Sequence, residues 1–503
     1  MNTFMIGLVI LVVGGAVYGK ICASVFGPDE RKTPAFTKAD GVDFVPMKTW
    51  RNTLINLLNI AGTGPVLGPI QGILFGPIAL ILIPVGCVLG GAMHDYFSGM
   101  IAMRNEGAQM PALVKKYSGK TVNGIYQVLV CLLMLLVGAV FTTTPGDLTA
   151  TETFRFLGVA KPAEWAWSGY VIWGIYAVIF AYYIIAVLFP IDAIIGKIYP
   201  IFGFILLLSA VGLFIGLFTG NYPLTELSWE NWKGVHPSGL HLIPIFFITV
   251  ACGIVSGFHS TQTAIISRTV THEKQGSTTF YYTMILEGFI AMVWAAAAMG
   301  ALNKGIAVGG ATPTPAPAVV SIVAYDMLGT VGGILAILGV IVLPITSGDT
   351  ALRSLRLMVA DAIGYDQKPM ANRLTLSIVI FVLTFGILYW SKTDANGFSI
   401  LWRYFAWSNQ MIAIFAFAII AIYLYGRGYT TAPYMSLLPG MWYAFITSSF
   451  ICNANIGFGL PMNTAYGIGA VFALVYAFLI YRTGKALNAS RLAGELIEPK
   501  PIY

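Results

Sequence analysis

The sequence predicts an all-α membrane protein, a polytopic bundle of about thirteen transmembrane helices with an inverted-repeat core and two broken helices. Three observations support this fold class. First, 57% of the residues are hydrophobic and only 10% are charged, whereas a soluble domain is nearer a quarter charged. Second, the apolar residues form stretches near the ~20 residues that a membrane helix needs. Third, two of these stretches are interrupted by Gly, Pro and polar residues, which lipid-facing helices do not tolerate.

The expected spans are helices, because they are too long and too continuously apolar for the strands of a membrane barrel. The first could be mistaken for a signal peptide, but it lacks a basic start and its apolar run is too long. In chain order the spans are 2–25, 54–75, 77–101, 122–142, 166–189, 197–219, 241–267, 279–300, 328–350, 373–391, 401–425, 434–452 and 462–481.

The positive charges indicate how the bundle is oriented. When the loop after the first span is placed in the cytoplasm, the cytoplasmic segments hold 22 of the 28 Lys and Arg residues and the outer segments hold 6. This asymmetry follows the positive-inside rule and explains the net charge of +7 without a nucleic-acid partner. We expect a multi-pass protein of the cytoplasmic (inner) membrane, with the N-terminus outside and the C-terminus inside.

The two interrupted spans are the second and the seventh, and they contain residues 56–69 and 253–262. Because they are five spans apart, they cross the membrane in opposite directions, as an inverted repeat of five helices requires. We therefore expect an additional helix at 1–25 and a transporter core at 26–430, with halves at about 50–220 and 240–425. Two further helices and a short cytoplasmic tail would occupy 431–503. Close packing of two Gly-rich helices without any transport role is the alternative interpretation.

The first interruption predicts a carboxylate-binding site. A break at Gly62 leaves free amides at the start of a half-helix, and those amides and the helix dipole favour an anion. We expect the amides around Thr63, Gly64 and Val66 to meet the carboxylate of a substrate. Pro65 has no N–H and cannot contribute.

The second interruption adds polar side chains at membrane depth. Ser256, His259 and Ser260 accompany Gly257, which thins the helix. A histidine changes its charge readily near neutral pH, so His259 is a candidate proton carrier or donor to a substrate carbonyl. A hydrogen-bonded histidine of the protein core is the competing interpretation.

Acidic residues inside membrane spans are costly and therefore candidates for ion coupling. Glu287 lies in the eighth span, where an interhelical hydrogen bond or salt bridge is the alternative role. Asp95 lies nearer the cytoplasmic end of the third span, with Arg104 beyond it. For Asp95, a gating or structural role is as well supported as ion coupling.

Long motifs spread along the chain resemble the carbon starvation protein A family of transporters. They include the stretches at 60–69 and 246–259, the surroundings of Glu287, the segment from Asp349 to Arg353, and 409–411. The resemblance implies uptake of peptides or pyruvate during nutrient limitation, and a likeness to the amino acid–polyamine–organocation superfamily. The chain lacks the large insertion that the longest members carry between the eighth and ninth spans, which leaves the substrate open.

The superfamily likeness implies a sodium site between the first and eighth core helices. Here those helices would supply the region of Ala61 together with Thr346, Ser347 and Asp349. Hydroxyl, carboxylate and carbonyl oxygens suit an alkali cation. Asp349 could instead pair with Arg353, four residues on.

The predicted function is a secondary active importer of a small carboxylate-bearing nutrient, either a short peptide or pyruvate, coupled to protons or sodium. The sequence has no ATP-binding P-loop and no metal-ligand spacing, so no cofactor and no resident metal are expected. An intramembrane enzyme built on Ser256 and His259 is one alternative, although its oxyanion site is unspecified. A nutrient sensor without net transport is another.

Overall fold

A computed structural model describes residues 1–41, 43–158, 170–188, 192–307, 314–367, 369–394 and 396–493. Helices are the regular elements in those ranges, and one isolated backbone bridge joins Met47 to Val270. The all-α fold class predicted from hydropathy is confirmed.

The chain begins with an apolar rod and then forms the first five core helices. The rod comprises α1 (Asn2–Val9), η1 (Ile10–Gly14) and α2 (Gly15–Phe26), and the short helix α3 (Pro34–Thr37) lies in the following loop. The first half then contains α4 (Thr49–Ile60), α5 (Gly64–Gly72), η2 (Ile73–Phe75), α6 (Ala79–Gly86), η3 (Cys87–Ala92), α7 (Met93–Arg104), α8 (Met110–Phe156), α9 (Tyr170–Leu188) and α10 (Asp192–Thr219).

The second half starts with a helix that is interrupted more than once. Its elements are η4 (Leu242–Phe246), α11 (Phe247–Thr249), α12 (Ala251–Ile254), α13 (Gly257–Ile266), η5 (Glu273–Gln275), η6 (Ser277–Tyr281), α14 (Tyr282–Asn303), α15 (Ala316–Ile363), α16 (Met370–Thr393) and α17 (Gly397–Gly426). The last two helices are α18 (Tyr434–Asn453) and α19 (Met462–Leu492).

The third long helix of each half carries the same backbone interruption. α8 leaves helical geometry at Gly119 (φ 87°, ψ 172°), and α15 does so at Gly329 (φ 66°, ψ −172°). Positive φ is a conformation that glycine adopts without steric cost. The matched interruptions, like the two broken helices, are what two copies of one five-helix unit produce.

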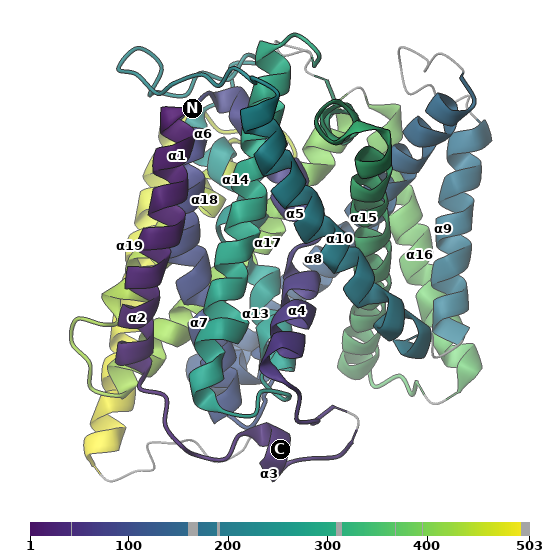
Figure 1. Ribbon diagram of the computed structural model, residues 1–503. Helices are drawn as coiled ribbons and strands as arrows, with labels where there is room; N and C mark the ends of the chain where they lie inside the picture. The colour runs from purple at the N-terminus through teal and green to yellow at the C-terminus, as the bar shows by residue number, and fades with distance from the viewer. Residues whose placement is uncertain are drawn as a thin grey trace.

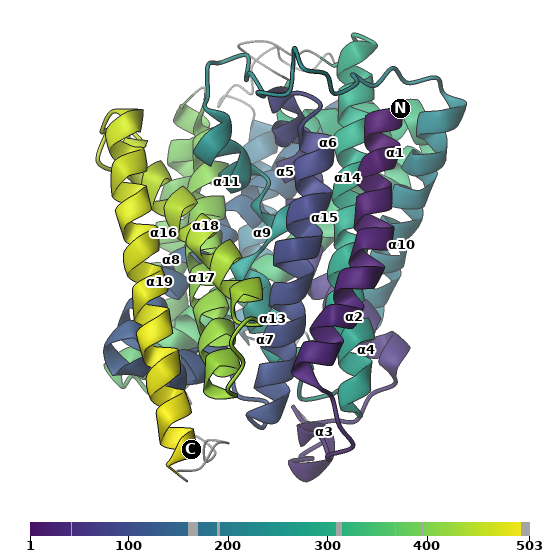
Figure 2. The same ribbon diagram turned by 90° about the vertical axis from the view of Figure 1, so that its left-hand side faces the viewer.

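The broken helices lie in the interior of the bundle. α5 and α13 occupy the middle in both side views, whereas α1 and α9 stand at opposite edges in Figure 1 and α19 stands at an edge in Figure 2. The N-terminus lies at one end of the bundle, and α3 and the end of α19 lie at the other. This placement agrees with an odd number of crossings.

Ten helices in the described part of the chain are long and apolar enough to span a membrane, and the bent pair α4–α5 adds an eleventh. The shorter helix α9 and the interrupted segment 242–266 occupy the two other predicted spans. The most apolar window of the span that contains α14 is 78% buried, whereas that of α19 is 22% buried. Thus α14 belongs to the interior and α19 faces the surroundings, while the domain boundaries at 25/26 and 430/431 stay predictions.

Candidate functional site

The first broken helix bends by 50° between α4 and α5. Ala61 leaves the helical region (φ −83°, ψ 62°), and Gly62 and Thr63 complete the break before α5 begins. Pro65 lies in the first turn of α5, where its missing N–H would have had no helical partner. The sequence therefore interrupts the helix at the predicted position and restarts it at once.

Some amides at this restart are used within the protein and others are not. The amides of Val66 and Leu67 both donate to the carbonyl of Thr63, at 3.2 and 2.9 Å. In the described part of the chain, the amides of Thr63 and Gly64 donate to no backbone carbonyl. The hydroxyl of Thr63 is buried and also has no partner. These free groups make Thr63 and Gly64 better candidates for anion contact than Val66.

The second break is held open by α17. Val255 (φ −149°, ψ 134°) and Ser256 (φ −131°, ψ 121°) are extended between α12 and α13. The Asn409 carboxamide accepts from the Phe258 amide at 2.8 Å and donates to the Ser256 hydroxyl at 2.9 Å. Gln410 donates to the carbonyl of Val255 at 3.2 Å. Neighbouring side chains thus satisfy backbone groups that a break inside a membrane would otherwise leave unpaired.

Two glycines allow the broken helices to approach their neighbours. A Cβ atom on Gly64 would lie 2.2 Å from the Cβ of Cys252, across the contact between α5 and α12. A Cβ on Gly257 would lie 2.3 Å from the backbone oxygen of Asn409. Neither position has room for a side chain. The glycines therefore let α5 pack closely on α12, and α13 pack closely on α17.

A small cavity of about 20 Å³, which has room for about one water molecule, lies between the two breaks. Three of its lining residues carry polar side chains, namely Asn59, Ser256 and Asn409. Its other walls are largely apolar, and every residue of the lining is electrically neutral. The full lining is Asn59, Ile60, Gly62, Gly64, Val137, Phe141, Cys252, Ser256, Phe258, Phe405 and Asn409. A small anion would therefore be held here by amide and hydroxyl groups.

The predicted substrate residues divide into two groups. Gly62, Gly64 and Ser256 line the cavity. The others belong to the same two segments but lie outside its lining, and they are Thr63, Val66, Gly257, His259 and Ser260. Gly257 packs on α17, and the Ser260 hydroxyl donates to the Gly257 carbonyl at 2.6 Å. The substrate-binding roles themselves stay predictions.

Sequence reasoning missed much of this lining. Asn59, Cys252 and Asn409 line the cavity, although the sequence analysis assigned no binding role to them. An Asn–Gln pair in an apolar span was the available signal for Asn409, because two adjacent amides need partners that lipid does not supply. The phenylalanines had no such signal, since three helices contribute one each: Phe141, Phe258 and Phe405.

Beside the second break, acids and imidazoles form a closed cluster. His259 Nδ1 lies 2.9 Å from Asp95 Oδ2, and His94 Nδ1 lies 2.8 Å from Asp95 Oδ1. His259 Nε2 faces Glu287 Oε2 at 3.5 Å. All four side chains are at most 1% exposed. We call His94, Asp95, His259 and Glu287 the core cluster.

The core cluster changes the interpretation of two predicted residues. Asp95 is buried between two histidines, and its gating, structural and ion-coupling roles all stay predictions. His259 is indeed hydrogen-bonded in the core, as the competing interpretation held. Yet its second nitrogen has no hydrogen-bond partner and faces an acid, so a proton-carrying role is also supported.

The predicted sodium-site residues have other contacts. Asp349 lies 3.3 Å from Arg353, which is the pairing left open from the sequence. The hydroxyl of Thr346 donates to the carbonyl of Leu343 at 2.9 Å. A cation site that joins these groups to Ser347 and Ala61 stays a prediction.

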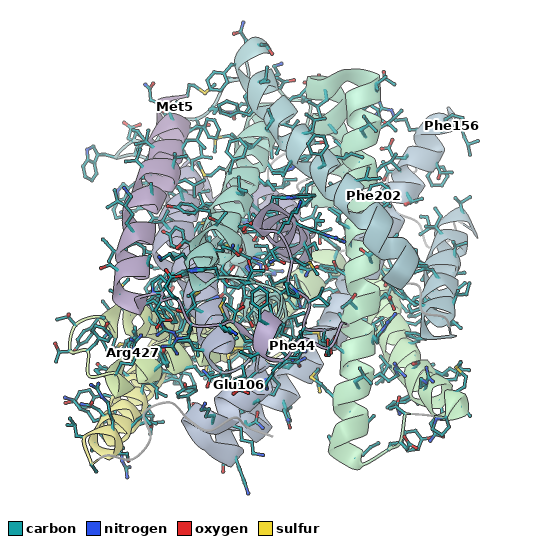
Figure 3. The ribbon with its side chains drawn as sticks, turned by 60° about the horizontal axis from the view of Figure 1, so that its bottom comes forward. Met5, Phe44, Glu106, Phe156, Phe202 and Arg427 are labelled. Atoms are coloured by element: carbon teal, nitrogen blue, oxygen red, sulfur yellow. The ribbon has the colours of Figure 1, made fainter. Side chains whose placement is uncertain are left out.

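The end of the bundle that carries α3 is closed by permanently charged pairs. Arg104 contacts both carboxylate oxygens of Glu273 at 2.9 Å, and both side chains are nearly fully buried. Lys38 pairs with Glu106 at 2.7 Å, and Phe44 packs on Gly107 beside it. Figure 3 shows Phe44 and Glu106 near each other at this end. We call residues 27–41 and 43–48, which pack on this end through Gly27, Asp29, Lys38 and Phe44, the strap.

The strap also has exposed attachments. Glu30 lies 2.5 Å from Lys274 and 2.6 Å from His272. These contacts, Lys274 first, lower the pKa of the Glu30 carboxyl to about 2. The Glu30 carboxyl therefore keeps its charge at neutral pH.

Comparisons with known proteins show what these features belong to. The model of a family described as "Carbon starvation protein CstA" matches residues 1–161, 159–328 and 307–449, which together cover most of the chain. The chain belongs to the CstA family. The resemblance that the motifs at both breaks indicated is confirmed, and this CstA-family protein is a membrane transporter.

Curated relatives extend the comparison. A Haemophilus influenzae protein described as an uncharacterized membrane protein is 40% identical over 332 residues, covering 58% of this chain and 88% of its own. The peptide transporter CstA of Escherichia coli is 24% identical, covering 85% of this chain and 78% of its own. The E. coli pyruvate/proton symporter BtsT is 25% identical, over 52% of this chain and 43% of its own.

Solved structures show the same fold. A manganese transporter from Eremococcus coleocola superposes with a TM-score of 0.56 at 11% identity, covering 88% of this chain and 94% of its own. MhsT, solved in complex with L-phenylalanine, superposes with a TM-score of 0.53 at 14% identity, over 85% and 98%. At these identities the likeness concerns the fold alone, and it agrees with the inverted repeat predicted from the spacing of the breaks.

The enzyme alternative is not supported. A nucleophile at Ser256 would need His259 as its base, but the Ser256 hydroxyl contacts Asn409 and the His259 ring faces Asp95 and Glu287. The family and the named relatives are transporters.

Proposed function

We propose that this CstA-family protein is a secondary active importer of small carboxylate-bearing nutrients, with pyruvate and short peptides as the two substrate classes to test. The observation that supports this most is the cavity between the two breaks. It lies where inverted-repeat transporters bind their substrates, at the junction of the discontinuous helices.

The chemistry of the cavity suits a carboxylate. Free amides at Thr63 and Gly64 stand at the start of α5, where the helix dipole favours negative charge. Ser256 and Asn409 add neutral polar groups to the lining, and the phenylalanines form apolar walls. Hydrogen bonds to a charged group contribute about 1.5–3 kcal/mol each, so a few such contacts suffice without an arginine or lysine.

We further propose that the protein lies in the cytoplasmic membrane with the end that carries α3 inside. The excess of Lys and Arg in the loops at this end supports that orientation. Single-cysteine variants at the strap and in the loop between α10 and η4 would test it. The strap position should be labelled by an impermeant thiol reagent only after the membrane is opened, and the reverse pattern would contradict the orientation.

Proton coupling is proposed over sodium coupling, because the core cluster holds exchangeable protons beside the cavity. The decisive experiment is uptake into proteoliposomes of the purified protein, with labelled pyruvate and labelled dipeptides. Accumulation above equilibrium under an inward proton gradient is expected for one of the two. Accumulation under a sodium gradient alone would instead support the predicted site near Asp349. Absence of counterflow with both substrate classes would contradict the proposed substrate class.

A further inference from the structure

Five carboxylates are buried in the described part of the chain, and they fall into two kinds. Three of them contact a lysine or arginine: Asp147 meets Lys392, Glu273 meets Arg104 and Asp349 meets Arg353. The other two, Asp95 and Glu287, form ion-pair contacts with imidazoles only in the described ranges. Lysine and arginine stay charged at neutral pH, whereas an imidazole can gain or lose a proton. The core cluster is therefore the place where buried charge can change.

The contacts of Asp95 define the proton positions for its ionised form. An ionised carboxylate only accepts, so with Asp95 ionised the facing Nδ1 atoms of His94 and His259 carry hydrogen. Asp95 thus accepts from two imidazoles, one on each oxygen. The Nε2 atom of His259 is left facing Glu287 Oε2 at 3.5 Å, and within the described residues neither atom forms a hydrogen bond.

We propose that the pair His259–Glu287 binds the coupled proton of the transport cycle, and that Asp95, with His94, is a positioning residue that holds the ring of His259. This inference rests on the proposed function. One proton can lie on Glu287 Oε2, which leaves both side chains of the pair neutral, or on His259 Nε2, which makes them an ion pair. The pair has no net charge in either arrangement, so with Asp95 ionised the net charge of the core cluster is −1.

Removal of that proton is costly while the site is closed. It would leave Glu287 ionised against a nitrogen lone pair and would raise the buried charge from one negative to two. An uncompensated buried charge is expensive in a low-dielectric interior, so the proton leaves only when water reaches the pair. The proton taken up from the outer side would then be released on the inner side, with no other bond made or broken.

The core cluster is joined to the cavity through shared residues. His259 lies one turn after Ser256, and the backbone carbonyl of Ile60, at the end of α4, faces its ring. Ser256 and Ile60 both line the cavity. A bound proton lowers the negative charge beside the cavity and favours an anion in it, and by linkage the anion favours the proton.

The groups that face the pair from neighbouring elements are few. The thiol of Cys87 on η3 and that of Cys252 on α12 interact electrostatically with Glu287. From α7, Asp95 contacts His259, and His94 contacts Asp95 in turn. Within the described ranges, no lysine or arginine forms an ion pair with either acid of the core cluster.

The test separates proton coupling from substrate binding. Wild-type protein and E287Q would be reconstituted, and pyruvate and a dipeptide used as probes in two assays, counterflow and accumulation under a pH gradient. Two pH units allow at most about 100-fold accumulation in one-proton symport of a monoanion, because each unit corresponds to a tenfold ratio. E287Q should keep counterflow and lose accumulation to a ratio of about 1, together with the proton influx seen by a trapped pH dye.

A matched control is E152Q. Glu152 on α8 accepts a hydrogen bond from Tyr325 at 2.6 Å, and an amide oxygen can accept the same bond. E152Q should show counterflow and pH-driven accumulation at the wild-type level. H259Q, a second variant in the pair, should behave as E287Q does.

Several results would overturn the inference. One is accumulation and proton influx in E287Q at the wild-type level under a pH gradient. Another is loss of accumulation and of proton influx in the control E152Q as well as in E287Q. If E287Q loses counterflow, the same two assays are carried out on H259Q. Proton influx at the wild-type level in H259Q would then overturn the inference. Absence of counterflow in the wild type would instead refute the proposed substrate class.

Discussion

The core cluster and the strap are both built from ionisable side chains, but they use different partners. At the end that carries the strap, the buried acid Glu273 meets Arg104, and the exposed Glu30 meets both Lys274 and His272. In the core cluster, acids meet only histidine. A permanent cation fixes an acid in one charge state, whereas an imidazole allows two. The comparison suggests that the strap holds the bundle closed at one end while the core cluster responds to protons.

The largest effect is expected at the contact between the two breaks. G64L would place a side chain where even a Cβ lies 2.2 Å from Cys252, so uptake should be abolished while membrane insertion is kept. Gly62 offers a graded comparison, since its Cβ would lie 3.4 Å from Phe141, at the edge of ordinary contact. G62L should block the cavity, whereas G62A should keep part of the activity. Uptake by G64L at the wild-type rate would remove the binding site from this place.

Matched Glu→Gln substitutions at Glu273 and Glu287 test directly whether the two regions differ in this way. E273Q removes the buried anion of Arg104 and leaves it only the exposed Asp29 at 3.8 Å, and removal of one partner of a buried pair costs about 3–5 kcal/mol. We expect a clearly lower melting temperature in detergent and more protease cleavage of the strap. A melting temperature equal to that of the wild type would mean that Arg104 finds another partner and that the strap is not held by this pair.

E287Q should behave in the opposite way in the same melting assay. It replaces an acid that lacks a permanent cation with a neutral amide of equal size, so the free energy of unfolding should change by less than about 1 kcal/mol or rise. Strong destabilisation by E287Q would assign Glu287 a structural role like that of Glu273.

The polar wall of the cavity predicts a moderate loss of affinity. N409A removes the group that caps α13 and holds Ser256. Loss of a hydrogen bond to a charged group costs about 1.5–3 kcal/mol, which corresponds to roughly 10- to 100-fold weaker binding. S256A should cost less, because the Asn409 carboxamide remains. Equal affinity in N409A and the wild type, measured by equilibrium binding of the labelled substrate, would exclude Asn409 from the site.

The smallest effect is expected at the exposed attachment of the strap. The pKa of Glu30 is lowered to about 2, so any stabilisation from its charge is complete above its ordinary value of 4.5 and is lost only as the pH falls through about 2. E30Q should therefore leave the pH profile of uptake between pH 5 and 8 unchanged, whereas E287Q should alter it. A shifted profile in E30Q would show that the strap also senses pH.

Much of the molecule follows from the sequence alone. Apolar stretches of membrane length determine the spans, and Gly and Pro at 62–69 determine the first break, because lipid cannot pair the freed backbone groups. The spacing of five spans determines that the broken helices run in opposite directions. The motifs at both breaks determine the family.

Only the tertiary structure decided which residues meet. Asp95 and Glu287 are 192 positions apart, and His259 joins them because the second helices of both halves pack around the second break. Asn409 lines the cavity because α17 packs against the second break. Hydropathy sets which segments enter the membrane but is the same all round a buried helix, so the side chains that face each other are fixed by packing.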